Sequence, residues 1–127
     1  MESEFANLNW LAVIVGTVVS FLLGMIWFTP KMFGRAWTAG MNDLQPPASL
    51  PIPAIILHLV GTFALALVIG ITATQDMLIT AILAILAVAI LQSASGLFKQ
   101  NSGKTVSVDA GYTIAMGAIM IIAQGIL

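Results

Sequence analysis

The chain contains no cysteine and a single histidine, and only 7% of its 127 residues are charged. Without cysteine it forms neither a disulfide nor a thiolate metal site. The lone His58 cannot supply the ligand set of a zinc or haem site, so we expect no metal and no cofactor. Four basic residues in the whole chain provide no clustered Lys/Arg patch, so nucleic acid is not an expected partner.

Hydrophobic residues, by contrast, make up 60% of the chain. Soluble domains carry about a quarter charged residues, so this composition indicates a protein whose main solvent is the lipid bilayer. Four predominantly apolar runs, 8–28, 52–72, 77–98 and 107–127, each approach the roughly 20 residues that cross a bilayer. The acidic start Met-Glu-Ser-Glu is unlike a signal peptide, so the first run is expected to stay as a helix. We therefore predict an all-α fold, an integral membrane four-helix bundle forming one domain over residues 1–127.

The connection between the first two runs, 29–41, has its own pattern. Pro30 should end the first helix. Lys31 and Arg35 then stand at an i, i+4 spacing among apolar side chains, which is typical of a short amphipathic segment in the headgroup plane. Residues 42–53 read as a loop, Asp76 as the N-cap of the third run and Ser107 as a cap of the fourth. The residues expected at the membrane interface are Trp10, Trp27, Lys31, Arg35 and Trp37.

The charges predict an orientation. The four bases, Lys31, Arg35, Lys99 and Lys104, lie in the first and third connections. Glu2 and Glu4 precede the first run and Asp76 lies in the second connection, on the opposite side of the membrane for an even number of spans. The positive-inside rule then predicts a plasma (inner) membrane protein with basic loops in the cytoplasm and both termini outside.

Two stretches carry a resemblance to a known family: NWLAVIVGTVVSFLLGMIWFTPKMFGRAW from Asn9 and DAGYTIAMGAIM from Asp109. They resemble small prokaryotic membrane proteins of domain of unknown function 1761, most closely in the first and last helices. Asp109 stands where that pattern usually has Asn. The resemblance implies a four-helix membrane protein and brings no activity with it. The matching residues are Asn9, Trp10, Trp27, Pro30, Phe33, Gly34, Trp37, Gly111 and Tyr112.

Small residues recur every fourth position on the predicted helices, a spacing that lets membrane helices approach closely. Such a stripe indicates either packing within one bundle or contact between copies of the chain, and the sequence leaves both open. The predicted packing residues are Gly16, Ser20, Gly24, Thr62, Gly70 and Gly117, with Gly125 continuing the stripe of the fourth helix.

Polar side chains within the spans define a candidate site: His58, Gln92, Asp109 and Tyr112, all expected at one depth in the cytoplasmic leaflet. We expect a polar neighbour to hold His58, with Asp109 or Gln92 the favoured partner. Simpler interpretations stay open. Asp109 suits the start of a helix because of the helix dipole, His58 can be a neutral imidazole without a proton-handling role, and Tyr112, Trp27 and Trp10 are expected to be interface anchors.

The sequence favours a non-enzymatic membrane protein, either an accessory or oligomeric helix-packing subunit or a small-ligand binder. The alternative is a small proton-coupled transporter in which His58 and Asp109 titrate. An enzyme ranks third because no nucleophile and base pair or phosphate-binding loop is visible. Expected partners are the lipid bilayer and further copies of the chain or a larger membrane complex. A water-accessible cavity at His58 would favour transport, whereas a closed layer would favour packing.

Overall fold

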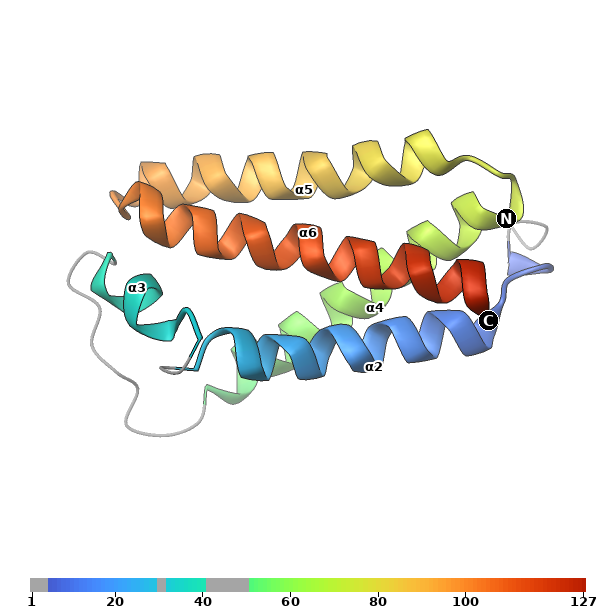
Figure 1. The fold of residues 1–127 in the computed structure, drawn as a ribbon, viewed down its shortest axis with the longest axis horizontal. Helices are drawn as coiled ribbons and strands as arrows, with labels where there is room; N and C mark the ends of the chain where they lie inside the picture. The colour runs from blue at the N-terminus through green and yellow to red at the C-terminus, as the bar shows by residue number, and fades with distance from the viewer. Residues whose placement is uncertain (1–4, 30–31, 41–50) are drawn as a thin grey trace.

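The protein is described by a computed structural model that covers residues 5–29, 32–40 and 51–127. The described elements are all helices (Figure 1). Four of them, α2, α4, α5 and α6, are long and apolar enough to cross a membrane, and the short α3 lies between the first two. The predicted fold class is therefore confirmed. The helices are α2 (Trp10–Trp27), α3 (Gly34–Ala39), α4 (Ile52–Thr74), α5 (Leu78–Phe98) and α6 (Gly103–Ile126).

Side-chain caps fix where α2 and α6 begin. Asn9 caps α2, its Oδ1 accepting from the backbone N–H of Ala12 at 3.1 Å. Ser102 caps α6, its Oγ accepting from the N–H of Thr105 at 3.1 Å. The predicted Ser107 cap is therefore wrong, because α6 starts one turn earlier. Ser107 lies inside the helix and donates to the carbonyl of Gly103 at 2.7 Å.

The turn between α4 and α5 shows that the predicted N-cap role of Asp76 is wrong. Asp76 has a φ of 55°, the left-handed conformation that follows a helix end. Its N–H donates to Ala73 O at 3.3 Å, and the N–H of Met77 donates to Thr72 O at 2.9 Å, which is a Schellman motif. Asp76 thus terminates α4, and Met77 is the N-cap residue of α5. Gln100, with a φ of 65°, ends α5 in the same way.

Consecutive long helices run in opposite directions, and α6 lies between α2 and α5 (Figure 1). α6 packs against α2 on one side and α5 on the other, while α4 crosses behind them at an angle. The core gathers on α6, where Met116 and Met120 contact buried side chains such as Val13 and Ile69. α4 and α5, in contrast, expose most of their apolar surface. The line along which α4 and α5 face each other, here called the seam, is therefore loosely packed, and a hollow of the site lies along it.

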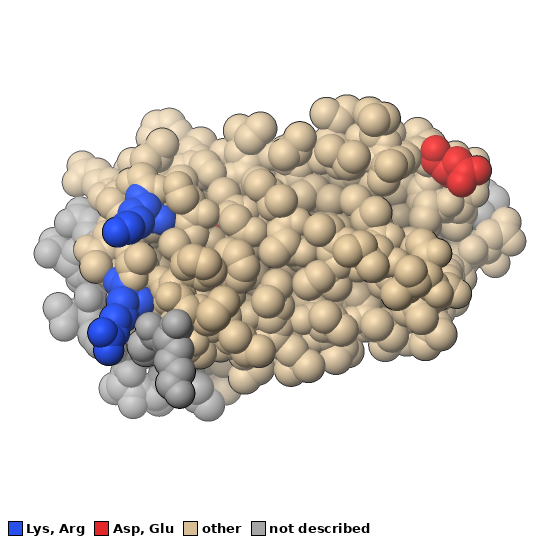
Figure 2. Space-filling view, in the orientation of Figure 1, with Lys and Arg blue, Asp and Glu red and all other residues tan. Residues whose placement is uncertain are grey.

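The charged side chains visible in Figure 2 lie at the two ends of the bundle. Lys and Arg cluster at the end where α3 lies, and an acidic side chain lies at the opposite end, while the surface between them in this view is uncharged. Lys31, Glu2 and Glu4 fall outside the described residues. An uncharged belt between two charged ends is the surface expected of an integral membrane protein.

Candidate functional site

The chain turns back on itself directly after α2 and leads into α3. The N–H of Phe33 donates to Trp27 O at 3.1 Å, and the N–H of Gly34 donates to Thr29 O at 2.9 Å. Glycine is required at position 34 because a Cβ there would collide with the carbonyl oxygen of Phe28. The indole of Trp27 and the ring of Phe33 then pack with centroids 4.6 Å apart. This turn directs α3 toward α6.

Three hydrogen bonds fix α3 to the start of α6. Thr105 Oγ1 donates to Trp37 O at 2.6 Å, and the N–H of Ser102 donates to Gly40 O at 2.8 Å. The indole N–H of Trp37 donates to Asp109 Oδ1 at 2.8 Å. The short segment was expected to lie in the headgroup plane with Trp37 as an interface anchor. Instead the Trp37 indole is half-buried and points toward α6, while Arg35 is exposed.

Two further aromatic residues expected at the interface also bond inward. Trp27 donates from Nε1 to the carbonyl of Val108 at 3.1 Å. Tyr112 is only 2% exposed and donates to the carbonyl of Ser20 at 2.7 Å. The interface-anchor interpretation of Tyr112 is therefore wrong: its hydroxyl needs a protein partner because it is buried between helices. Trp10, at the start of α2, stays 47% exposed.

Tyr112 is also the partner of His58. The Nε2 atom of His58 lies 2.9 Å from the Tyr112 hydroxyl, and the two ring centroids are 5.5 Å apart. The expectation that a polar side chain holds His58 is confirmed, but the favoured partners were wrong. Asp109 bonds to Trp37, and Gln92 Oε1 accepts from Thr113 Oγ1 at 2.6 Å. These partners differ because α3 covers Asp109 and the face of α6 that bears Thr113 turns toward α5.

The hydroxyl geometry assigns the imidazole tautomer. A tyrosine hydroxyl has one proton, and here that proton goes to the Ser20 carbonyl. The hydroxyl must therefore accept from His58, so the proton of the neutral ring is on Nε2. Nδ1 is then an acceptor.

The four residues predicted as one polar cluster all line one cavity of about 400 Å³. His58 reaches it from α4, Gln92 from α5, and Asp109 and Tyr112 from α6. The remaining walls are mainly apolar and come from α2, α3 and α4: Phe21, Gly24, Met25, Phe28, Trp37, Ala54 and Ile55. We refer to this cavity as the His58 pocket. The four residues thus lie around one cavity, and their hydrogen bonds differ from the predicted pairing.

A second hollow of about 260 Å³ adjoins the His58 pocket along the seam between α4 and α5. His58, Gln92 and Tyr112 line both cavities. On α4 the hollow is bordered by Leu57 and Gly61, both exposed on the outer surface of the helix. In a helix that crosses a bilayer, this exposed surface is at the depth of the acyl chains.

The predicted packing residues all lie on buried faces within this one chain. A Cβ at Gly24 would lie 2.5 Å from the Tyr112 hydroxyl, and one at Gly117 would collide with Ile85. Gly16 abuts Met120, and Gly70 abuts Val13. Thr62 donates to the carbonyl of His58 at 2.7 Å, whereas the hydroxyl of Ser20 is buried without a partner in the described structure. Gly125 has no neighbour within 4 Å of a Cβ among the described residues.

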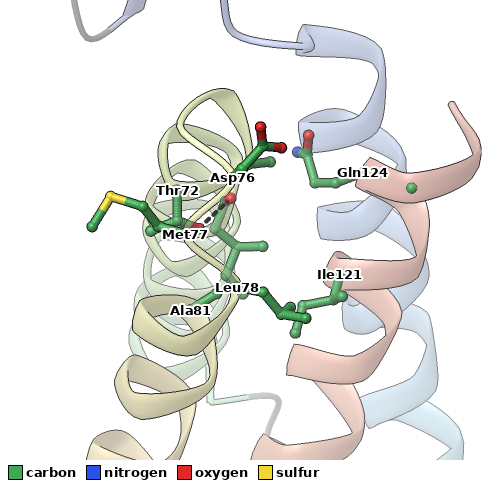
Figure 3. Close-up of a pocket in the computed structure, with 10 residues that line it drawn as sticks. Thr72, Asp76, Met77, Leu78, Ala81, Ile121 and Gln124 are labelled. Carbon is green, nitrogen blue, oxygen red and sulfur yellow. Dashed lines mark hydrogen bonds between the residues drawn. The ribbon is translucent and has the colours of Figure 1, made fainter.

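A third cavity, of about 280 Å³, lies at the opposite, acidic end between the α4–α5 turn and α6 (Figure 3). The Asp76 carboxylate and the Gln124 amide point toward the same space, above an apolar wall that includes Leu78 and Ile121. No residue of the predicted cluster lines this cavity.

Sequence reasoning missed three contacts of the site, those of Trp37 with Asp109, Trp27 with Val108, and Thr105 with the end of α3. The first had a signal, because an acidic group inside a span needs a donor and an indole N–H is one. The contacts of Trp27 and Thr105 had no such signal in the sequence, because their partners are backbone carbonyls, which every residue carries.

Comparison with known protein families matches nearly the whole chain. The family model described as "Protein of unknown function (DUF1761)" matches residues 11–125, which run from α2 almost to the end of α6. No curated protein and no solved structure matches the chain.

Proposed function

The chain belongs to the DUF1761 family of proteins of unknown function, and from its geometry we propose a non-enzymatic integral membrane protein that binds a small ligand in the His58 pocket. One observation carries the proposal. Four polar side chains from three helices converge on a cavity of about 400 Å³ that is otherwise mainly apolar. Small-ligand sites generally have this composition, with apolar walls and a few placed polar groups, and span roughly 300–1,000 Å³.

The bilayer is the proposed route of entry. The adjoining hollow opens the pocket along the seam between α4 and α5, and α4 exposes Leu57, His58 and Gly61 there. A ligand dissolved in the acyl-chain region would reach His58 without crossing the headgroups. This favours an amphipathic ligand over an ion or a sugar.

A helix-packing subunit is less well supported. That function does not need a cavity at the His58 layer, and the small residues Gly24 and Gly117 are occupied by neighbours in the same chain. The exposed apolar faces of α4 and α5 are consistent with lipid contact and also with further copies of the chain. A homo-oligomer is compatible with ligand binding and is proposed only alongside it.

Proton-coupled transport remains the second candidate because His58 and Asp109 line the same pocket. Two features weigh against it. Each of the two residues is held by a different aromatic partner. The chain of hydrogen bonds from His58 through Tyr112 ends on the carbonyl of Ser20, which cannot pass a proton onward.

The orientation is likewise a proposal. We place the end that carries Arg35, Lys99 and Lys104 in the cytoplasm, following the positive-inside rule. The His58 pocket is then in the cytoplasmic leaflet, because α3 and the start of α6 form part of it.

Co-purification tests the ligand proposal. The protein is extracted from its own membrane in mild detergent, and bound small molecules are identified by mass spectrometry. Ala54→Phe fills the pocket from an exposed position on α4, so we expect it to lose the bound molecule. Ala64→Phe is the matched control, because Ala64 is exposed on the same helix and lines none of the three cavities. Equal recovery from both variants, or no bound molecule in the wild type, would contradict the proposal.

A further inference from the structure

We propose that the ligand of the His58 pocket is a lipophilic organic cation, a primary ammonium group on an apolar body, with Asp109 as its counter-charge. The inference rests on the proposed function and specifies its chemistry. It is carried by three features of the pocket: an acidic group without an ion-pair partner in the described structure, a wall of aromatic rings, and an excess of hydrogen-bond acceptors.

Asp109 is the only acidic residue within α2, α4, α5 and α6. It is half-buried, and Trp37 is its one hydrogen-bond partner in the described part of the chain. Of the described bases, Lys99 acts on it only through longer-range charge. An ionised carboxyl in an apolar pocket is stabilised strongly by a cation at contact distance. A ligand that brings such a charge would complete the site.

Aromatic rings form much of the pocket wall that Asp109 shares. Phe28 packs against Trp37 with centroids 4.6 Å apart and against Tyr112 at 5.4 Å, and Phe21 lies 5.8 Å from the His58 ring. All five side chains line the pocket together with Asp109. Ring faces attract an ammonium within about 6 Å of the centroid, and the attraction strengthens when water is excluded.

Acceptors outnumber donors among the polar groups. Asp109 offers only acceptors when ionised, and His58 keeps Nδ1 as an acceptor because its proton is on Nε2. The donors facing them are the two amide protons of Gln92, whose Oε1 accepts from Thr113. An ammonium group brings three donors, a hydroxyl one and a carboxylate none. The expected order of affinity for one alkyl chain is therefore amine, then alcohol, then fatty acid, whose charge would also repel Asp109.

Intrinsic fluorescence provides the measurement. The Trp10→Phe variant keeps only Trp27 and Trp37 as reporters, and Trp37 lines the pocket. Protein in phosphatidylcholine nanodiscs is titrated with dodecylamine, N-acetyldodecylamine, dodecanol and dodecanoate. We expect dodecylamine to bind at least ten-fold more tightly than its neutral N-acetyl counterpart. This comparison needs no change at Asp109, so it stands whether or not a variant there folds.

Asp109→Asn removes the charge and keeps an oxygen that can accept from Trp37. We expect it to weaken amine binding at least ten-fold and dodecanol binding by a much smaller factor, because the alcohol carries no charge. Asp76→Asn is the matched control, since Asp76 lies at the opposite end and does not line the pocket.

The outcomes separate the two proposals. If amine, N-acetyl amine and alcohol bind alike, or if the fatty acid binds best, the cation inference fails and ligand binding stands. If none of the probes changes the fluorescence, and nothing co-purifies with the wild type, both proposals fail. Adding phosphatidylethanolamine to the nanodiscs identifies the source of the ammonium. Competition with dodecylamine indicates an aminophospholipid headgroup, and its absence a free lipophilic amine.

Discussion

The Nε2 atom of His58 lies 2.9 Å from the hydroxyl of Tyr112, fifty-four positions along the chain. This contact joins α4 to α6 at the layer where α2, through Ser20, accepts the tyrosine proton. One hydroxyl thus connects three of the four long helices. The hydrogen-bonding state of His58 therefore reports whether α2, α4 and α6 are packed together.

We predict that the imidazole is neutral with its proton on Nε2. Because His58 is the only histidine, ¹⁵N labelling of that residue reports the tautomer directly by NMR. Tyr112→Phe removes the acceptor and should mix the two tautomers. Phe21→Leu is the control, as it alters a ring neighbour of His58 without touching the hydrogen bond. A wild-type ring protonated on Nδ1 would show that the hydroxyl donates to His58 and not to Ser20.

Gly117→Ala should destabilise the bundle by about 1–3 kcal/mol, because the added methyl overlaps the side chain of Ile85. Ile85→Ala, which removes all three side-chain atoms that the added methyl overlaps, should cost less stability in the Gly117→Ala background than in the wild type. Gly125→Ala, on the same predicted stripe but with no described neighbour, should have little effect. Thermal unfolding in detergent gives all three comparisons. Additive effects of the Gly117 and Ile85 changes would rule out the contact.

Trp37→Phe keeps a ring against Phe28 but removes the donor to Asp109. Hydrogen bonds to charged groups contribute about 1.5–3 kcal/mol, so a loss of stability in that range is expected. Trp10→Phe removes an indole from an exposed position and should leave the melting temperature nearly unchanged. Equal shifts for the two tryptophans would mean that α3 is not anchored through Asp109.

Asp76→Gly should raise stability by about 0.5–1 kcal/mol. Its left-handed φ of 55° strains a residue that has a Cβ, and glycine adopts this conformation freely. Asp76→Asn should be nearly neutral, since asparagine also tolerates this region. The measurement is chemical unfolding in mixed micelles. If Asp76→Gly instead lowered stability, Asp76 would act as the N-cap of α5, contrary to the structure.

The orientation can be tested with single cysteines, because the natural chain has none. A membrane-impermeant thiol reagent applied to intact cells should label Asp76→Cys and spare Lys104→Cys. Lysis should make Lys104→Cys reactive, and Arg35→Cys should follow it because both lie at the basic end. Labelling of Lys104→Cys in intact cells would reverse the proposed topology.

The sequence by itself determined the four long apolar helices and their approximate ends, and it predicted His58, Gln92, Asp109 and Tyr112 as one layer. These features follow from length and hydropathy, because a bilayer of fixed thickness sets both the number of spans and the depth of each residue. The helix-start role of Asn9, by contrast, and the corrected caps at Ser102 and Asp76 depend on local backbone geometry. Several Ser, Asn and Asp residues near each helix end could have served equally.

Only the tertiary structure decided which side chains face one another within the layer. Depth fixes one coordinate of a residue, while pairing also depends on the rotation of each helix and on what covers it. Because α3 folds back over α6, Trp37 donates to Asp109, and His58 forms its hydrogen bond with Tyr112 instead. Because α4 crosses the bundle at an angle, its seam with α5 stays open and the polar layer lines a pocket.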